Sequence, residues 1–202
     1  MTLPDREQVR RALLIAGPTA SGKSAAALAL ATRFGATVVN ADSMQVYQDL
    51  RILTARPTPE EERLAPHRLF GAIDGAVNYS VGRWAQAAGE VLADISERPV
   101  IFVGGTGLYF RALTEGLSDI PAVPETVRAE IRSKAEGRAT PELHDELAAR
   151  DPETAARLNA SDRQRILRAL EVVASTGRPL VSFLGARSAP ALQQGEWTGL
   201  YL

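Results

Sequence analysis

The stretch Gly17-Pro-Thr-Ala-Ser-Gly-Lys-Ser24 decides the fold of this chain. It matches the pattern G-x-x-x-x-G-K-[ST], in which glycines let backbone N–H groups converge on phosphate oxygens and the next helix adds its positive end. Lysine occurs only at Lys23 and Lys134 in 202 residues, so a match by chance is rare. The predicted phosphate-binding loop, or P-loop, comprises Gly17, Pro18, Thr19, Ala20, Ser21, Gly22, Lys23 and Ser24.

Two side chains of the P-loop define its ligand further. Lys23 supplies a positive charge for the outer phosphate, and the Ser24 hydroxyl is placed to bind a Mg²⁺ ion that bridges phosphate oxygens. The loop therefore predicts a diphosphate or triphosphate ligand, with Mg²⁺ as the cofactor at Ser24. It leaves the reaction open.

The segments around the P-loop alternate between apolar runs and helical patterns. Residues 12–16 read as a buried strand, residues 24–33 as a helix, and residues 36–40 as a second buried strand. A helical pattern over 82–96 and an apolar run over 100–103 continue this order. The alternation predicts an α/β fold class, with a P-loop NTPase-like parallel sheet core flanked by helices and an all-helical insertion.

The insertion is marked by a change in composition. Beyond residue 116, prolines separate short helical stretches, and no strand pattern appears before the last residues. We predict a P-loop core over 1–116, a helical insertion over 117–185, and a return to the core sheet over 186–202. A buried parallel sheet would not normally end at such a strand, so we expect the chain to be part of a longer protein.

Proline and glycine positions indicate where helices of the insertion begin and end. Thr140 and Asp151 each precede a proline, the pattern of an N-cap followed by proline at the first helical position. Ser161 and Gln164 have the spacing of a capping box, and Gly177 marks the end of that helix.

Composition excludes several classes of protein. The formal net charge of −1 gives no global field for a polyanion, so any nucleic acid must be held by a local patch. Without cysteine there is no disulfide framework, thiolate zinc site or thiol nucleophile. No apolar run approaches the roughly 18 residues of a membrane span, and we expect a cytoplasmic protein with no membrane partner.

Asp42 follows the second predicted strand, where a parallel sheet presents the carboxyl ends of its strands to the ligand crevice. A carboxylate there can bind metal through water or take a proton from an incoming nucleophile. The alternative is an aspartate that only terminates the strand.

The third predicted strand ends in Gly104-Gly-Thr-Gly107 instead of an acid, which counts against an ordinary motor ATPase or GTPase. The glycines allow close backbone approach to a ligand, and Thr106 adds a hydroxyl. A plain tight turn is the alternative.

The clearest basic patch lies in the predicted insertion. Residues 163–178 contain four Arg and one Glu, and Gln164 and Arg168 lie one helical turn apart. Arginine forks can hold phosphates and glutamine can contact a base edge, whereas a solvated helix face is the alternative. Arg128 could add a further fork, with an ordinary surface arginine as the alternative.

Five motifs, taken in order, resemble those of the tRNA dimethylallyltransferase family. They are the P-loop, Asn40-Ala-Asp-Ser-Met-Gln-Val-Tyr47, Thr54-Ala-Arg-Pro57, Gly104-Gly-Thr-Gly-Leu-Tyr109 and Asp162-Arg-Gln-Arg-Ile-Leu-Arg-Ala-Leu-Glu171. The resemblance departs from the family at Arg56, where lysine is common, and at Ser24, where threonine is common. Neither change removes the charge or hydroxyl that the position supplies.

The resemblance implies transfer of a dimethylallyl group from dimethylallyl diphosphate to the exocyclic N6 amine of the adenosine immediately 3′ of the anticodon in tRNA. Lys23 and Mg²⁺ at Ser24 would neutralise charge on the leaving diphosphate, which makes both residues candidate catalytic residues. The family implies that Asp42, the third catalytic candidate, receives the proton of the amine.

The resemblance also implies that the helical insertion over 117–185 binds tRNA, and it implies which residues contact the anticodon stem-loop of the tRNA partner. They are Asp42, Ser43, Met44, Gln45, Thr106, Arg128, Gln164, Arg165, Ile166, Leu167 and Arg168. We expect a monomer that extrudes the target adenine from its stack, since the amine must reach the reacting carbon.

Three other functions remain open. An adenylate isopentenyltransferase would use the same donor with a free nucleotide, although the 164–168 motif and the insertion argue against it. A P-loop small-molecule kinase would transfer phosphate from ATP. A truncated module would bind RNA without catalysis.

Overall fold

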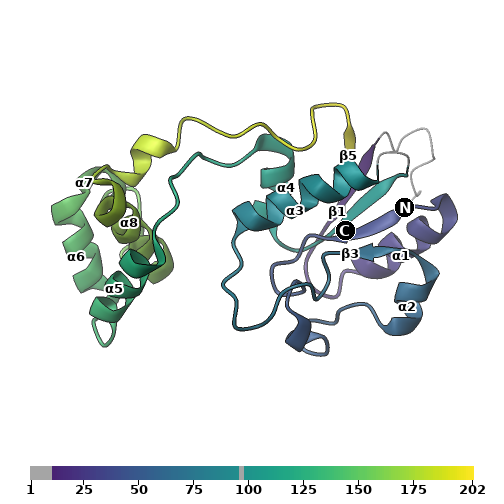
Figure 1. Ribbon diagram of the computed structural model, residues 1–202, viewed down its shortest axis with the longest axis horizontal. Coiled ribbons are helices and arrows are strands. Elements are labelled where there is room, and N and C mark those ends of the chain that lie inside the picture. The colour runs from purple at the N-terminus through teal and green to yellow at the C-terminus, as the bar shows by residue number, and fades with distance from the viewer. Residues whose placement is uncertain (1–10, 96–97) are drawn as a thin grey trace. The chain divides into compact units, whose positions relative to one another are not determined.

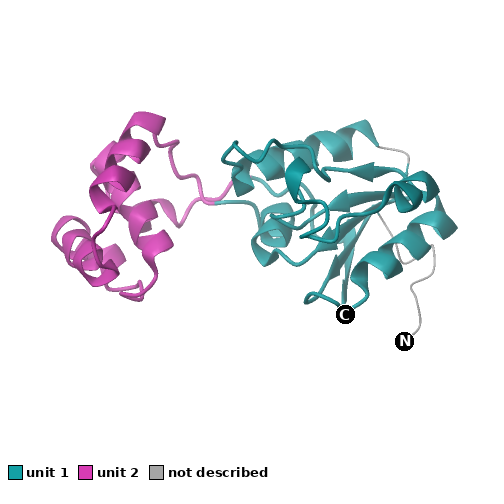
Figure 2. Cartoon of the chain, turned by 90° about the horizontal axis from the view of Figure 1, so that it is seen from below, with its two compact units in different colours: residues 1–117, 189–202 teal, residues 118–188 magenta. Residues whose placement is uncertain are grey.

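The structure, a computed structural model, describes residues 11–95 and 98–202 and divides into two compact units (Figure 2). Unit 1 comprises the described residues up to Leu117 together with Ala189–Leu202, and unit 2 comprises Ser118–Ser188. Each unit has hydrophobic clusters of its own.

Unit 1 is built on a five-stranded sheet in the order β3-β2-β4-β1-β5, and all strand pairs are parallel (Figure 1). The strands are β1 Ala12–Ala16, β2 Thr37–Asn40, β3 His67–Arg68, β4 Val100–Gly104 and β5 Trp197–Tyr201. β2 and β4 are buried along their whole length, as expected for strands of a parallel sheet that is covered on both faces. The predicted α/β class and the predicted closing strand are both confirmed.

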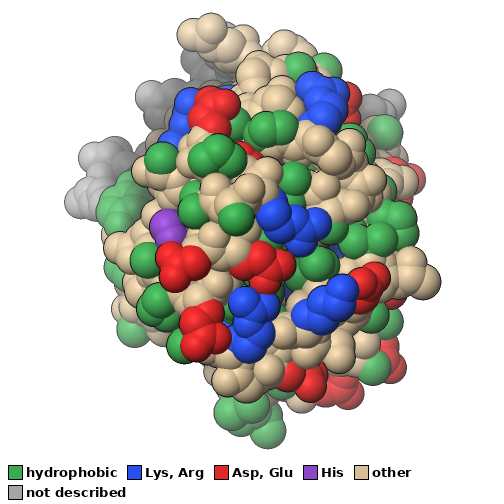
Figure 3. Space-filling view, turned by 90° about the vertical axis from the view of Figure 1, so that its left-hand side faces the viewer, with side chains coloured by type: hydrophobic (Ala, Val, Ile, Leu, Met, Phe, Trp, Pro, Cys, Tyr) green, Lys and Arg blue, Asp and Glu red, His purple; other side chains and the backbone are tan. Residues whose placement is uncertain are grey.

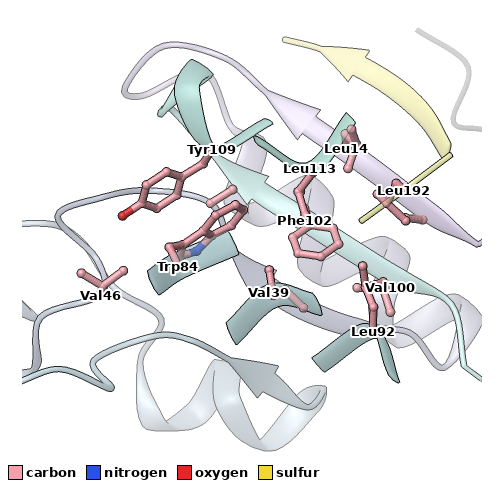
Figure 4. Close-up of a cluster of buried hydrophobic side chains, with 13 residues drawn as sticks. Leu14, Val39, Val46, Trp84, Leu92, Val100, Phe102, Tyr109, Leu113 and Leu192 are labelled. Atoms are coloured by element: carbon pink, nitrogen blue, oxygen red, sulfur yellow. The ribbon is translucent and has the colours of Figure 1, made fainter. Parts of the chain in front are cut away.

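Helices cover both faces of this sheet. They are α1 Lys23–Phe34, α2 Pro59–Leu64, α3 Val81–Asp94 and α4 Gly107–Glu115, with a 3₁₀ turn, η2, at Gln48–Leu50. Successive strand residues point to opposite faces, so Phe102 packs with α3 and α4 around Trp84, whereas Ile101 packs with α1 around Leu30. Figure 4 shows the first of these clusters.

Unit 2 is helical. Its elements are α5 Glu125–Ala135, α6 Thr140–Arg150, α7 Pro152–Ala155, α8 Arg163–Thr176 and a 3₁₀ turn, η3, at Leu180–Phe183 (Figure 1). α8 supplies Ile166, Ala169 and Leu170 to a cluster that also contains Leu143 and Leu147 of α6. No helix of the described residues in either unit is long and apolar enough to cross a membrane.

A buried aspartate holds the short elements of unit 2 together. Asp151 is 0% exposed; its Oδ1 accepts the N–H of Thr154 at 3.0 Å and its Oδ2 accepts the N–H of Leu180 at 2.9 Å. The Thr154 hydroxyl oxygen accepts the N–H of Val181 at 3.3 Å. Asp151 thus caps α7, as predicted, and also fixes the start of η3.

Two other predicted helix starts are wrong by one residue. Asp162 caps α8 by accepting the N–H of Arg165, while the Ser161 hydroxyl bonds to Asn159, so the predicted capping box does not form. Thr140 is already the first residue of α6, which Ala139 precedes without a side-chain cap. The predicted end of α8 at Gly177 is confirmed, because that residue adopts a φ of 66°. The predicted helix over 82–96 ends at Asp94, and residue 96 lies outside the described residues.

Candidate active site

The P-loop connects the end of β1 to the start of α1. Gly22 occupies the N-cap of α1 with a φ of 84°, and no side chain caps the helix. Lys23 Nζ donates to the carbonyl oxygen of Pro18 at 2.8 Å, which holds the ammonium group over the loop. Ser24 is the second residue of α1 and is exposed. The first-turn N–H groups, the ammonium and the Ser24 hydroxyl therefore gather at one helix end.

Ser21 adds a further hydroxyl group to the P-loop. Its Oγ is buried and has no hydrogen-bond partner among the residues that the structure describes. Buried hydroxyl groups in folded proteins normally have a partner. An anionic oxygen bound in the loop would supply one, so the loop has the donors that a diphosphate requires.

Asp42 lies in a turn directly after β2. Its backbone N–H donates to Oδ1 of Asn40 at 2.8 Å, and its own Oδ1 accepts the N–H of Met44 at 2.9 Å. The other carboxylate oxygen, Oδ2, faces Gly105: a Cβ built on that glycine would lie 3.5 Å from Oδ2 and 3.7 Å from the carbonyl oxygen of Gly17. The carboxylate thus borders the turn after β4, and the same turn borders the first residue of the P-loop.

Gly104, the last residue of β4, and Thr106, two residues further on, fix that turn against Asp42. A Cβ on Gly104 would collide with the carbonyl of Ala41, so only glycine fits there. The Thr106 hydroxyl accepts the N–H of Ser43 at 2.9 Å and donates to the Ser43 hydroxyl at 3.3 Å. Thr106, a predicted tRNA contact, therefore also joins the two turns.

Asn40 is a site residue that sequence reasoning missed. It is 0% exposed, and its Nδ2 donates to the carbonyl oxygens of Asp42 at 2.9 Å and Leu69 at 3.2 Å. The backbone carbonyl oxygen of Asn40 accepts the indole N–H of Trp84 at 2.9 Å. A buried side-chain amide at the end of a strand must find such partners. An asparagine at the end of a predicted buried strand was therefore the sequence signal for this role.

An aromatic pair lies against the same strand end. Trp84 and Tyr109 stack with ring centroids 4.1 Å apart, and Figure 4 shows the Tyr109 hydroxyl directed away from the cluster. Burial raises the pKa of Tyr109 above its ordinary value, and the nearby charge of Asp42 adds to this shift. Burial also raises the pKa of Tyr79. Both phenols therefore keep their protons well above neutral pH.

Arg56, where the family often has lysine, organises the loop that follows Asp42. Its Nη1 donates to the carbonyl oxygens of Tyr47 at 3.1 Å and Gln48 at 3.0 Å, and its guanidinium packs on Gly71. Burial lowers the pKa of Arg56. The predicted tRNA contact Gln45 donates to the carbonyl of Thr54 at 2.8 Å, so its amide also supports this loop.

The remaining predicted tRNA contacts lie in unit 2, and the structure separates them into two kinds. Gln164 and Arg165 are exposed. Arg128 and Arg168 both pair with Glu171, and so does Arg132. Glu171 and Arg132 were not among the residues predicted from the sequence. Ile166 and Leu167 belong to the helical core instead. Ile166 is 0% exposed, so its predicted contact with RNA does not fit the structure, and Leu167 is partly buried.

The P-loop after β1, the carboxylate after β2 and the glycine-rich turn after β4 meet at the carboxyl ends of neighbouring parallel strands. These features define a P-loop NTPase-like α/β protein. A sequence model described as IPP transferase matches residues 45–200. The chain belongs to this family, which confirms the resemblance.

Close relatives carry one functional name. A tRNA dimethylallyltransferase of Methylocella silvestris is 62% identical over 95% of this chain and 64% of its own length. One from a Methylobacterium species is 66% identical over 88% of this chain and 58% of its own length. The chain thus spans about three fifths of the relatives that it matches.

Solved structures agree with the sequence relatives. A eukaryotic dimethylallyltransferase acting on tRNA matches with a TM-score of 0.75 at 26% identity, over 96% of this chain and 48% of its own. The tRNA isopentenylpyrophosphate transferase of Bacillus halodurans matches with a TM-score of 0.52 at 37% identity, over 84% and 57%.

Proposed function

We propose that this protein transfers a dimethylallyl group from dimethylallyl diphosphate to the N6 amine of the adenosine immediately 3′ of the anticodon in tRNA, and releases diphosphate. The observation that carries the proposal is that Asp42 Oδ2 and the carbonyl oxygen of Gly17, the first residue of the P-loop, both border Gly105 in the turn after β4. Family membership and the names of the relatives support the same reaction.

The reaction requires stabilisation of the leaving diphosphate and removal of a proton from the attacking amine. An exocyclic amine is a weak nucleophile, so the allylic C–O bond must break as the N–C bond forms, and the electron pair of the C–O bond leaves with the diphosphate. The α1 amides, Lys23 and the Ser21 hydroxyl stabilise that developing charge. Asp42 receives the proton that the amine loses, through Oδ2, while its Oδ1 stays bonded to the N–H of Met44.

Ser24 would hold a Mg²⁺ ion through its exposed hydroxyl. No group of three His, Cys, Asp or Glu side chains suited to a metal occurs among residues 11–95 and 98–202. This fits Mg²⁺, which binds through few protein ligands when phosphate oxygens and water complete its shell. When bound, the ion supplies further charge neutralisation on the diphosphate.

The site also accounts for a tRNA partner. Ser43, Met44 and Gln45 follow Asp42 directly, and Met44 is 51% exposed, so these residues form one edge of the reacting centre. In unit 2, Gln164 and Arg165 are exposed at the start of α8. We propose that unit 2 binds the stem-loop backbone, and that the protein acts as a cytoplasmic monomer.

Three acceptor mixtures test the proposal. Each contains the protein, Mg²⁺ and dimethylallyl diphosphate labelled in the allyl group, with unmodified tRNA, AMP or no acceptor. We expect label in tRNA only. Label in AMP would support an adenylate isopentenyltransferase, phosphate transfer from ATP in a parallel assay would support a kinase, and tRNA binding without label transfer would support an RNA-binding module.

A further inference from the structure

Three arginines of unit 2 surround one buried carboxylate. Glu171 of α8 has a side chain only 3% exposed, and its Oε1 accepts a hydrogen bond from Nε of Arg132 at 3.1 Å. Its Oε2 lies 3.8 Å from Nε of Arg128 and 3.6 Å from Nη1 of Arg168. Arg128 and Arg132 belong to α5 and Arg168 to α8, so these three residues, the arginine array, join two helices.

The arginine array reaches solvent although the carboxylate beneath it does not. The side chains of Arg128, Arg132 and Arg168 are 27%, 57% and 38% exposed. Three positive charges against Glu171 leave a net of two. Glu125 also lies 2.9 Å from Arg128, but its side chain is 72% exposed, and such a surface pair is screened by salt.

In the ion pairs described elsewhere in unit 2, every partner is at least 32% exposed. Arg157 and Glu153, each 61% exposed and 3.0 Å apart, are typical. Figure 3, which looks onto unit 2, shows Lys and Arg side chains next to Asp and Glu side chains. The array differs because three cations share one covered anion.

This arrangement is poorly explained by stability alone. A carboxylate loses hydration when it enters a helical core, and an apolar side chain of similar volume is often as stabilising or more so. A buried anion does, however, hold arginine forks in a fixed direction. Arg132 contacts Glu171 through Nε and its side chain is 57% exposed, so its two Nη groups are available as donors in the described contacts.

We infer that Arg128, Arg132 and Arg168 form one phosphodiester-binding site for the RNA substrate, and that Glu171 is the positioning residue that orients them. The inference rests on the proposed function, because that function supplies the RNA. A phosphodiester fits because its two unesterified oxygens can accept from neighbouring guanidinium groups. Arg132 and Glu171 thereby join the RNA-binding residues that the family resemblance implies.

Replacing Arg132 tests the site directly. Arg132→Gln and the matched control Arg157→Gln each remove one charge from an arginine of unit 2, and the two side chains are 57% and 61% exposed. Binding of a labelled anticodon stem-loop is measured by fluorescence anisotropy over a salt series.

We expect Arg132→Gln to weaken binding about tenfold near 0.1 M salt, the loss of one charge-assisted hydrogen bond. The slope of log K against log salt should fall by roughly 0.7 to 0.9. Arg157→Gln should change the affinity less than about twofold, as expected for a surface pair. Equal effects of the two variants would overturn the inference.

Replacing Glu171 separates positioning from charge. Glu171→Gln removes a negative charge, so electrostatic attraction alone would strengthen RNA binding. Positioning predicts weaker binding, because the three guanidinium groups lose their common anchor. Circular dichroism identifies folded protein, and tighter binding by folded Glu171→Gln protein would overturn the inference. If that variant does not fold, the comparison of Arg132→Gln with Arg157→Gln decides.

The same proteins keep this inference distinguishable from the proposed function. Wild-type protein that transfers the allyl group while all variants bind RNA equally would refute the arginine site and leave the proposed function intact. Wild-type protein that binds the stem-loop through Arg132 but transfers nothing would support the site and refute the proposed chemistry.

Discussion

Asp42 is held by its neighbours in one orientation. One carboxylate oxygen is engaged by the N–H of Met44, and the backbone on both sides is fixed by Asn40 and Thr106. The other oxygen, Oδ2, borders Gly105, which also borders the carbonyl oxygen of Gly17 at the start of the P-loop. A base fixed in this way needs no reorientation during proton transfer, which is the condition for efficient general-base catalysis.

Asp42→Asn should therefore lower the rate of transfer by roughly two to four orders of magnitude, the usual contribution of a general base. The asparagine oxygen can still accept the N–H of Met44, so tRNA affinity should change little. Asp74→Asn is the matched control, since Asp74 Oδ1 accepts the N–H of Ala76 two residues on in the same way. Single-turnover rates and stem-loop affinities check both, and comparable losses of rate and affinity would indicate a structural role.

Gly104→Ala should destabilise unit 1 by about 1 to 3 kcal/mol, because its methyl group collides with the Ala41 carbonyl. Gly107→Ala is the control: a Cβ there meets nothing within 4 Å, and Gly107 begins α4. Urea unfolding of the two variants gives the comparison. Equal stability of both would show that the turn after β4 is not tightly packed against Asp42.

The sequence predicted the residues of this site that carry a recognisable pattern. The P-loop, Asp42 and Thr106 were found because glycine spacing and strand ends have known consequences in a parallel sheet. Asn40 and Glu171 were missed, because their roles come from hydrogen-bond and charge partners far along the chain. Ile166 was misassigned, because a motif does not say which face of its helix is buried.

At the scale of elements, aspartates in the connections of unit 2 fix where its helices begin. Asp151 caps α7 and holds the start of η3, and Asp162 caps α8. The strands and long helices of unit 1 were predictable, since continuous apolar runs and helical spacing suffice for buried elements. The element α4 was not predicted, because glycines at its start argue against a helix. β3 has only two residues and no period to detect.

Asp151→Ala should destabilise unit 2 by about 2 to 4 kcal/mol. The change leaves the amides of Thr154 and Leu180 without their acceptor in a buried position, and it removes a helix cap. Asp162→Ala, at a cap whose side chain is 36% exposed, should lose only about 1 kcal/mol. Chemical denaturation followed by helix content measures both, and an equally small loss for Asp151→Ala would contradict the buried clamp.

The Arg138–Glu146 pair should make the stability of unit 2 depend on pH. A hydrogen bond from Arg138, 2.6 Å long, lowers the pKa of Glu146 in the folded state. A lowered folded-state pKa contributes stability above the unfolded pKa of the glutamate, near 4.5, and this contribution is lost as the pH falls through the folded pKa.

The difference in unfolding free energy between wild-type and Arg138→Gln protein should therefore be present at pH 6 and shrink toward zero as the pH falls below 4. Because Glu146 is partly exposed, we expect no more than about 1 kcal/mol at pH 6. A difference that stays constant over this range would refute the assignment.

At the scale of the whole molecule, the chemistry and the contacts beside the target adenosine are assigned to unit 1, and binding of the stem-loop backbone is assigned to unit 2. Unit 1 carries the P-loop, Asp42 and Thr106, and unit 2 carries the arginine array. A loss of charge in unit 2 should act on RNA affinity, whereas a change at Asp42 should act on turnover. This division explains why a near-neutral chain can be assigned a polyanionic partner: the positive charge is local.

In the proposed reaction, the allyl carbon of the donor is transferred to tRNA, and both phosphorus atoms stay in the diphosphate held by the P-loop. The most direct measurement uses dimethylallyl diphosphate that carries one label on the allyl carbon and another on phosphorus, together with unmodified tRNA and Mg²⁺. We predict the carbon label in the tRNA, at the adenosine immediately 3′ of the anticodon, and the phosphorus label in free diphosphate in equal amount. Phosphorus label in the RNA, or no carbon label in RNA that the protein demonstrably binds, would contradict the account.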